Sequence, residues 1–225
     1  KYKLTREALD AYAIESYRRA AEATLTGKFK HEIIPVKVEQ KSGDVFIDKD
    51  EDIDKIIVDK VSKLKPTFEK NGNLTAANSS NLNDGAAALI LASEEAVKKY
   101  NLKPIARIKG YADAAQAPEW FTTSPALAIP KALKAAGLKL SDIDYFEINE
   151  AYASVILSLQ QLLELDLKKV NVYGGAVAMG HPIGASGARI ITTLTSVLKQ
   201  EGGKYGVAAI CNGGGGASAI VIENL

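Results

Sequence analysis

Apolar residues recur at helical spacing near the start of the chain. Thr5 is a suitable N-cap, and Gly27 supplies a stop signal. One face of the intervening segment is apolar or aromatic, and it carries Leu9, Tyr12, Ala13, Tyr17 and Ala20. The pattern predicts a long amphipathic helix with its tyrosines in the core, although a phenol at the edge of such a face can also reach a bound group.

The next part of the chain contains short β-like runs and then a charged stretch. The runs span 32–38 and 45–48, and acidic and basic residues alternate from Asp48 to Lys65. Alternating charge is typical of a solvated face. Isolated lysines such as Lys55 could instead meet a phosphate at the mouth of a cleft.

Strands and helices alternate through the rest of the sequence. A small, polar loop at 74–85 precedes the apolar run Ala86–Ala92, which we expect to be a buried strand. The later pattern predicts helices at 94–99 (capped by Ser93), 125–136 (capped by Ser124), 152–163 and 186–198, with strands at 105–111, 145–148, 170–173, 206–210 and 217–222. Strands alternating with helices indicate an α/β protein with a layered sheet.

Composition excludes several classes of function. The 28 Lys and Arg residues nearly balance 27 Asp and Glu residues, which argues against a nucleic-acid partner or a polybasic membrane arm. A single cysteine forbids an internal disulfide and fits a reducing compartment. No apolar run approaches the roughly 20 residues that span a bilayer, and residues 1–30 lack a signal-peptide core. We therefore expect an intracellular protein without membrane attachment.

Two glycine-rich segments carry the most reactive side chains. In the segment 174–189, Pro182 pushes His181 out of the α region onto an extended corner. The helix that follows points its N-terminal dipole at the imidazole, which predicts a neutral ring. In the segment 208–216, Cys211 lies just ahead of consecutive glycines.

These residues admit more than one interpretation. A lone histidine in a glycine-rich turn usually fills space, but a cysteine in a second such corner makes His181 and Cys211 a candidate catalytic pair. Asn149 follows the predicted strand 145–148, where reactive groups gather in α/β sheets, and it could equally cap the next helix. An amide, an imidazole and a thiol at three strand exits are what an acyl-transfer site requires.

Three motifs resemble the C-terminal signature sequences of the thiolase family. They are Asn149-Glu150-Ala151, the segment 180–184 (GHPIG) and Cys211 with the glycines that follow it, in the family's order and spacing. The resemblance extends to the helix around Tyr12 (DAYAIESY) and to the loop 75–80 (TAANSS). The CNGGGGAS ending is most similar to the short-chain, acetoacetyl-CoA type, the acetyl-CoA C-acetyltransferases, and among these to the cytosolic enzymes that feed the mevalonate route to sterols.

The resemblance implies a reversible Claisen condensation of two acetyl-CoA molecules to acetoacetyl-CoA and CoA. In the family, one cysteine is acetylated, the histidine activates it, and a second cysteine moves the α-carbon proton. His181 and Cys211 match the last two roles, whereas the residues alone would make Cys211 the nucleophile. Asn149 matches the residue that holds a water which, with His181, stabilises the enolate. The amide of Gly213 matches a donor of the second oxyanion hole.

The resemblance also implies the contacts with coenzyme A, a substrate rather than a prosthetic group. Ser80 matches a serine on the pantetheine, Phe68 and Leu82 match tunnel positions, and Tyr152 stands where phenylalanine is more usual. Lys55 matches a basic residue near the adenine, where arginine is commoner.

A potassium ion is implied by one short match. The Ala-Ala pair at 76–77 stands where the family usually has Ala-Gly, and in the mitochondrial acetoacetyl type it accompanies a bound potassium ion. By that match the ligands would be Tyr12, Ala76, Ala77, Ser79 and Val177.

The family's nucleophilic cysteine would precede everything in this chain. The resemblance therefore implies part of the layered α-β-α-β-α thiolase fold: most of the CoA-binding loop domain at 1–83, a strand and helix at 84–104 that return to the largely missing N-terminal domain, and the C-terminal domain at 105–225. We expect this chain to be inactive without the N-terminal domain, its missing partner, and we expect the intact protein to be a homo-oligomer, by resemblance a tetramer.

Other functions and locations stay open at this point. The alternatives are a non-catalytic CoA-binding or interaction fragment and a degradative 3-ketoacyl-CoA thiolase. The expected compartment is the cytoplasm, with the mitochondrion and the peroxisome as alternatives.

Overall fold

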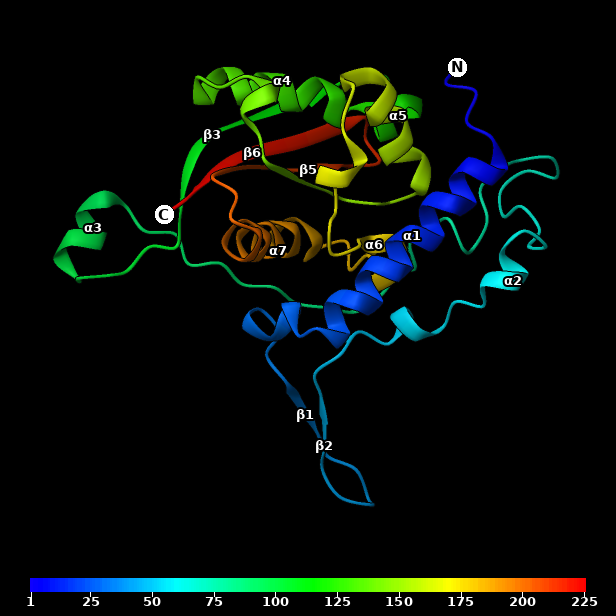
Figure 1. Cartoon of the computed structure of the whole chain (residues 1–225), viewed down its shortest axis with the longest axis horizontal. Helices are drawn as coiled ribbons and strands as arrows, with labels where there is room; N and C mark the ends of the chain where they lie inside the picture. The colour runs from blue at the N-terminus through cyan, green and yellow to red at the C-terminus, as the bar shows by residue number, and fades with distance from the viewer.

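A four-stranded mixed sheet organises the second half of the chain (Figure 1). The computed structural model describes residues 1–225. The strand order is β3-β6-β5-β4. β6 runs antiparallel to both β3 and β5, whereas β4 and β5 are parallel. The strands are β3 (Ala106–Ala115), β4 (Tyr145–Ile148), β5 (Tyr205–Cys211) and β6 (Gly216–Asn224).

Helices cover both faces of this sheet (Figure 1). The helices α4 (Pro125–Ala136) and α5 (Ala153–Leu163) lie on one face, and α7 (Ser186–Glu201) lies on the other. The long helix α1 (Arg6–Leu25) packs against α5 and the short helix α6 (Ala176–Met179). The α/β layered prediction is confirmed.

Alternation along the strands divides the core into two layers. On β5, Val207 and Ala209 pack into the apolar cluster that contains α4 and α5. Ala208, between them, packs instead with Leu194 and Leu198 of α7. Successive side chains point to opposite faces of a strand, so each face of the sheet contributes one row of buried residues to its covering helices.

The first helix forms as its pattern predicts. The Thr5 side chain accepts a hydrogen bond from Ala8 N at 3.2 Å, and Gly27 adopts a left-handed conformation with φ of 74° just beyond the helix. The predicted apolar face is buried throughout, at Leu9, Tyr12, Ala13, Tyr17 and Ala20. The phenol of Tyr12 nevertheless reaches a polar group, Glu150, as described below.

Three further helical features complete the fold. Ser93 caps α3 (Glu94–Lys99), as predicted. Ser124 occupies the N-cap position of α4, as predicted, but its side chain makes no capping hydrogen bond, and its hydroxyl donates to Gly215 O at 2.7 Å instead. The remaining short helices are α2 (Val58–Val61) and 3-10 turns at Lys28–His31, Asp52–Asp54, Pro118–Thr123, Leu140–Asp142 and Leu167–Lys169. No helix combines the length and the apolar character needed to cross a membrane.

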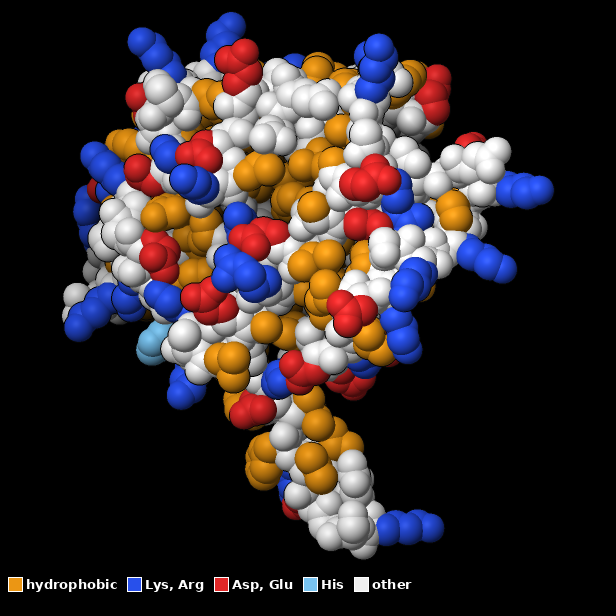
Figure 2. All heavy atoms as spheres, turned by 45° about the vertical axis from the view of Figure 1, so that its right-hand side comes forward, with side chains coloured by type: hydrophobic (Ala, Val, Ile, Leu, Met, Phe, Trp, Pro, Cys, Tyr) orange, Lys and Arg blue, Asp and Glu red, His pale blue; other side chains and the backbone are white.

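A two-stranded hairpin projects from the body of the protein (Figure 1). It consists of β1 (Val36–Val38) and β2 (Val45–Ile47), paired antiparallel, and every residue of both strands is exposed. Apolar side chains lie along this projection in Figure 2. A hairpin without a hydrophobic face packed on a third element is marginally stable in water, so this one is suited to contact another surface.

The expected buried strand at Ala86–Ala92 is absent. This segment has no regular structure, and Ile90 is 95% exposed and Leu91 77% exposed. A strand requires a partner for its backbone groups, and no other strand of this chain lies beside the segment. The apolar pattern is present in the sequence, but the chain offers it no sheet to join.

The expected strand at 170–173 is also wrong. Only Val170 forms a bridge, to Phe146, and Asn171 then turns the chain with φ of 49°. The Asn171 side chain accepts from Ile148 N and donates to Ile148 O, both at 2.8 Å. A side-chain amide thus replaces the backbone partner that a fifth strand would have supplied at the edge of β4.

Candidate active site

His181 is held through both nitrogens of its ring. Nδ1 lies 2.6 Å from Ser186 Oγ, and Nε2 lies 3.2 Å from Asn149 Nδ2. The Ser186 hydroxyl donates to Pro182 O at 3.0 Å, so it accepts from Nδ1–H. Nε2 is then the unprotonated nitrogen, which accepts from the Asn149 amide and is the basic atom of the site.

The surroundings of His181 favour the neutral ring. Burial lowers the pKa of the imidazole, and the charge of Arg189 lowers it further. The predicted neutral histidine agrees with both causes. At neutral pH the ring can therefore take up a proton from an acidic group during reaction.

Backbone geometry fixes the corner that carries His181. The residue follows the helix α6 rather than a strand, so the prediction of three strand exits is wrong at this position. Gly180 has φ of 89°, and a Cβ there would lie 2.2 Å from Asn83 Oδ1, which leaves room for glycine alone. The His181 amide donates to Asn81 O at 2.8 Å. The loop 81–83 thus anchors the histidine corner.

Asn149 directly follows β4 and is completely buried. Its backbone amide donates to Ala209 O on β5 at 2.9 Å. The helix-capping interpretation is wrong, because Tyr152 occupies the N-cap of α5 and the Asn149 side chain turns to His181. Its Oδ1 has no partner within the chain, so this acceptor is available to a group that enters the site.

Cys211 is the last residue of β5, and it lies at the same end of the sheet as Asn149. The strands β4 and β5 are parallel, and Asn149 is bonded to Ala209, two residues before the cysteine. Burial raises the pKa of the Cys211 thiol to about 11. A thiol of this kind rests protonated, which suits proton transfer rather than the low-pKa thiolate of an activated nucleophile.

The glycines after Cys211 form a tight turn with one free amide. Asn212 Oδ1 accepts from Gly214 N at 3.1 Å and from Gly216 N at 3.3 Å, and Asn212 O accepts from Gly215 N at 3.2 Å. The amide of Gly213 makes no hydrogen bond within the chain, and the residue is exposed. A preorganised donor of this kind is suited to an oxyanion.

The residues expected to contact coenzyme A lie around the loop 79–83. Ser80 donates to Ala151 O from both its amide and its hydroxyl, each at 3.1 Å. Tyr152, which pairs with Ser79 in an isolated bridge, meets Phe68 edge to face with 6.0 Å between ring centroids. Leu82, in the same loop, is 80% exposed.

Lys55, the residue expected near the adenine, forms an ion pair within the chain. Its ammonium lies 2.6 Å from Asp52 Oδ1, and Asp52 Oδ2 also accepts from Asn81 and Asn83 of the loop. Lys55 therefore lies beside the same loop, but its charge is already paired. This agrees with the solvated-face interpretation as well as with a phosphate contact.

The five expected potassium ligands offer neutral oxygens. The carbonyl oxygens of Ala76, Ala77, Ser79 and Val177 accept no hydrogen bond within the chain. Tyr12 Oη donates to Glu150 Oε1 at 2.6 Å, and Val177 N donates to Glu150 Oε2 at 3.1 Å, so both lie at one carboxylate. Carbonyl and phenol oxygens suit a hard monovalent cation. No cluster of three or more His, Cys, Asp or Glu side chains is present for a divalent metal.

Sequence reasoning gave no role to four residues that hold His181 or the segments packed near it. These are Ser186, Glu147, Glu150 and Arg189. Glu147 and Glu150 are buried acids, and a charged residue within a predicted buried strand was the available signal for Glu147. Ser186 stood only as the start of a helix, and its contact with the histidine could not be read from spacing.

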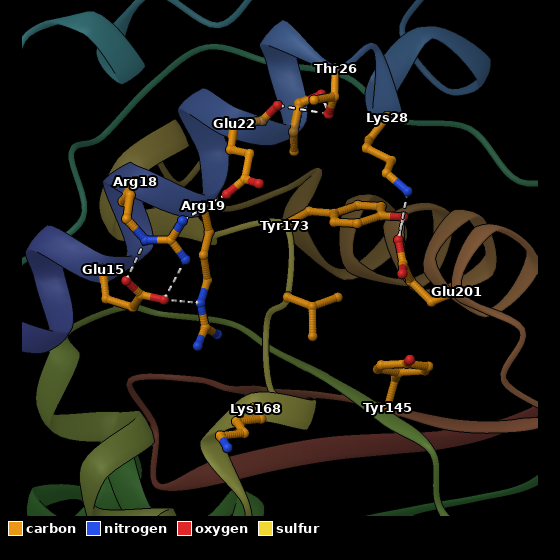
Figure 3. Close-up of a pocket in the computed structure, with 12 residues that line it drawn as sticks. Glu15, Arg18, Arg19, Glu22, Thr26, Lys28, Tyr145, Lys168, Tyr173 and Glu201 are labelled. Atoms are coloured by element: carbon orange, nitrogen blue, oxygen red, sulfur yellow. Dashed lines mark hydrogen bonds and ion pairs between the residues drawn. The ribbon is translucent and has the colours of Figure 1, made fainter.

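One cavity, of about 560 Å³, lies away from all of these residues (Figure 3). Its walls come from α1, α7 and the segment around Tyr173. The charges in it pair with each other, Arg18 with Glu15 and Lys28 with Glu201, each at 2.7 Å. A second cavity, of about 380 Å³, is lined by residues 83–87 and 182–185 and so borders the histidine corner.

Comparison with known proteins identifies the family of the chain. The family described as "Thiolase, C-terminal domain" matches residues 102–224, and "Thiolase, N-terminal domain" matches residues 1–95. The layered α/β protein with this histidine, asparagine and cysteine belongs to the thiolase family. The family resemblance predicted from the sequence is thereby confirmed. The division at 83 and 104 stays a prediction.

The similar proteins carry one recurring name. The chain is 55% identical to a probable acetyl-CoA acetyltransferase of Dictyostelium discoideum, over 100% of this chain and 55% of that protein. It is 52% identical to "Acetyl-CoA acetyltransferase ERG10, cytosolic" of Gibberella zeae, over 100% of this chain and 57% of that protein. The chain therefore spans about half the length of the curated relatives that it matches.

Solved structures agree with this assignment. The acetyl-CoA acetyltransferase of Bacillus anthracis superposes with a TM-score of 0.96 at 43% identity, over 100% of this chain and 57% of that one. The Acat5 thiolase from Ascaris suum, in complex with coenzyme A, gives a TM-score of 0.93 at 51% identity, with the same coverage of 100% and 57%. The thiolase fold predicted from the sequence is confirmed.

Proposed function

We propose that this chain supplies the acid–base and oxyanion-hole residues of an acetyl-CoA acetyltransferase, which condenses two acetyl-CoA molecules to acetoacetyl-CoA and CoA. The observation that carries the proposal is a neutral His181 fixed between Ser186 and Asn149. Cys211, with a protonated thiol, lies at the same end of the sheet as Asn149, because β4 and β5 are parallel. The relatives named acetyl-CoA acetyltransferase support the choice of substrate.

The first half of the reaction acetylates a cysteine that this chain does not contain. A partner segment of thiolase type would bring that cysteine to Nε2 of His181, where its thiol replaces the Asn149 amide as the donor. Nε2 takes the thiol proton while sulfur attacks the carbonyl carbon of acetyl-CoA, and CoA leaves as a thiolate. The free amide of Gly213 donates to the carbonyl oxygen as negative charge develops there.

The second half forms the carbon–carbon bond. The departing CoA thiolate takes the proton of the Cys211 thiol. The Cys211 thiolate then removes a proton from the methyl carbon of a second acetyl-CoA, and the resulting carbanion attacks the acetylated cysteine, whose sulfur leaves and takes its proton back from His181. A thiol with a pKa of about 11 has a conjugate base strong enough for a carbon acid. While the enolate exists, His181 still carries the proton taken at Nε2 and donates it in a hydrogen bond to the enolate oxygen, and Asn149 supports the same oxygen through a bound water. Ser80, Phe68, Leu82 and Tyr152 hold the pantetheine, and Lys55 exchanges Asp52 for a phosphate.

Replacing Cys211 with serine separates the two halves. We expect Cys211→Ser, in the protein completed by its nucleophile-bearing segment, to lose condensation by about 10²–10⁴-fold because a proton carrier is removed. Acetylation from radiolabelled acetyl-CoA, measured by acid quench, should keep its rate, since His181 is intact. The chain alone is the control and should acquire no label.

That experiment also tests the assignment of the function. If Cys211→Ser abolishes labelling as well, Cys211 acts in the first half, and the division of roles between His181 and Cys211 is wrong. If the completed wild-type protein neither labels nor condenses acetyl-CoA, the proposed function itself fails.

A potassium ion at Tyr12, Ala76, Ala77, Ser79 and Val177 is a further part of the proposal. When bound, it would order the loop that carries Ser80. We expect replacement of potassium by sodium to raise the apparent Kd of the completed protein for CoA, measured by calorimetry, because sodium is too small for the same carbonyl set. Equal affinities in the two salts would exclude this role.

Assembly and compartment complete the proposal. The exposed apolar side chains of the β1–β2 hairpin support contacts between copies, as in the tetramer expected from the family resemblance. A cytosolic location, and a place in sterol biosynthesis, are supported by the name of the Gibberella zeae relative.

A further inference from the structure

Arg189 shares a helix face with the residue that orients His181. It lies three positions after Ser186 on α7, and residues at this spacing are neighbours on the helix surface. Ser186 contacts the imidazole directly, and α7 packs against β4 and β5. The Arg189 side chain therefore extends from the same helix, and the same face of it, as the residue that contacts the His181 ring.

The strand β4 presents a matching pair of side chains to α7. Phe146 and Ile148 belong to the apolar cluster on the opposite face of the sheet, so Glu147 and Asn149 face α7. Asn149 contacts His181 Nε2, and Glu147 Oε2 lies 3.6 Å from Arg189 Nη1. The helix α7 therefore supplies Ser186 to His181 and Arg189 to the charged pair. The strand β4 leads into Asn149, which contacts His181, and supplies Glu147 to the same charged pair.

The Glu147–Arg189 pair does not form a closed salt bridge. A separation of 3.6 Å is too long for a hydrogen bond, and both Glu147 oxygens and Arg189 Nη1 are buried without a hydrogen-bond partner. Glu147 is only 1% exposed, and burial raises its pKa to about 8. The carboxyl group is therefore mostly protonated at neutral pH and leaves the guanidinium charge largely uncompensated.

Burial also weakens two other acids near Arg189 as counter-charges. Glu32 accepts a hydrogen bond from Thr193, and burial raises its pKa as well. Asp50 also lies near the guanidinium, and burial of its carboxyl raises its pKa in the same way. A guanidinium remains protonated under all ordinary conditions.

We propose that Arg189 is a positioning residue whose charge, held between α7 and β4, adds to the effect of burial in keeping the His181 ring neutral and its Nε2 unprotonated. The effect of Arg189 on the protonation of His181 does not depend on the proposed function. The consequence of that effect for catalysis does rest on it. A ring that has already taken a proton from solvent cannot take one from a thiol. The charge of Arg189 thereby sets how far the pH can fall before the site loses its base.

The titration of His181 tests the proposal without turnover. The chain has only two histidines, and the exposed His31 provides an internal reference in the same spectrum. In the purified protein, NMR titration of the two rings should give a His181 midpoint below the ordinary value of about 6.5. Arg189→Met should move that midpoint upward and leave the midpoint of His31 unchanged.

Two further variants separate charge from packing. Arg189→Lys keeps a positive charge and should keep the low His181 midpoint. Glu147→Gln should leave the midpoint where it is, because Glu147 is already protonated over that pH range. Circular dichroism identifies any variant that does not fold, and Arg189→Gln then replaces Arg189→Met.

The outcomes are distinct. A His181 midpoint that does not rise in a folded, neutral Arg189 variant overturns the proposal, and so does a wild-type midpoint at or above about 6.5. A midpoint that falls in Glu147→Gln would show that an ionised Glu147 already compensates Arg189, which also overturns it. Failure of the proposed function alone would leave all these midpoints as expected and appear only in the acetylation assay.

Discussion

His181→Ala should lower turnover of the completed protein by about 10²–10⁴-fold, the usual contribution of a positioned general base. The loss follows from the geometry, since Nε2 is the basic atom of the site and alanine supplies no substitute. The affinity for CoA should change little, because the residues expected to hold it belong to other segments. Steady-state rates with acetyl-CoA, together with calorimetric titration of CoA, measure the two quantities separately.

The second histidine supplies a matched control for this variant. His31 is exposed at the end of a short turn, and His31→Ala should leave both turnover and CoA affinity unchanged. Equal losses of rate and affinity in His181→Ala would mean that the histidine corner is structural. The loop 81–83 would be the reason, because the His181 amide is bonded to Asn81 O.

Local pattern was sufficient for the elements of the layered sheet. The predicted bounds of α4 and β4 match the structure, because Pro125 and Gly137 delimit one and a run of buried residues defines the other. Such signals depend on residues close together in the sequence, so they can be recognised without knowing which other segments pack against the element. The cap of α1 at Thr5 was predictable for the same reason.

Contacts between distant segments were not predictable. The sequence around Asn149 is also typical of a helix cap. Only the folded structure, in which its side-chain amide contacts His181, 32 positions later, shows its actual partner. Asn171 had the sequence context of a strand, but its side chain replaces the strand at the edge of β4. Residues 86–92 read as a buried strand because periodicity reports a tendency to pair, and it does not report whether a partner exists.

Glu150 joins the histidine corner to the first helix, and its loss should destabilise the fold. The carboxylate is fully buried and accepts hydrogen bonds from Tyr12 Oη at 2.6 Å, Ser16 Oγ at 2.8 Å, Asn171 Nδ2 at 2.9 Å and Val177 N at 3.1 Å. These donors come from α1, from the turn at Asn171 beside β4, and from α6. One side chain therefore sets the positions of three segments that precede His181 or pack beside it.

Glu150→Ala should lower the free energy of unfolding by about 3 kcal/mol or more, because each buried donor left without an acceptor costs about 1–3 kcal/mol. Glu150→Gln should lose less, since it keeps the shape and one oxygen acceptor. Urea denaturation followed by circular dichroism measures the difference, with Glu7→Ala on the exposed side of α1 as the control. An Ala variant as stable as that control would show that water replaces the carboxylate, and the His181 corner would then owe its position to Asn81 and Ser186 alone.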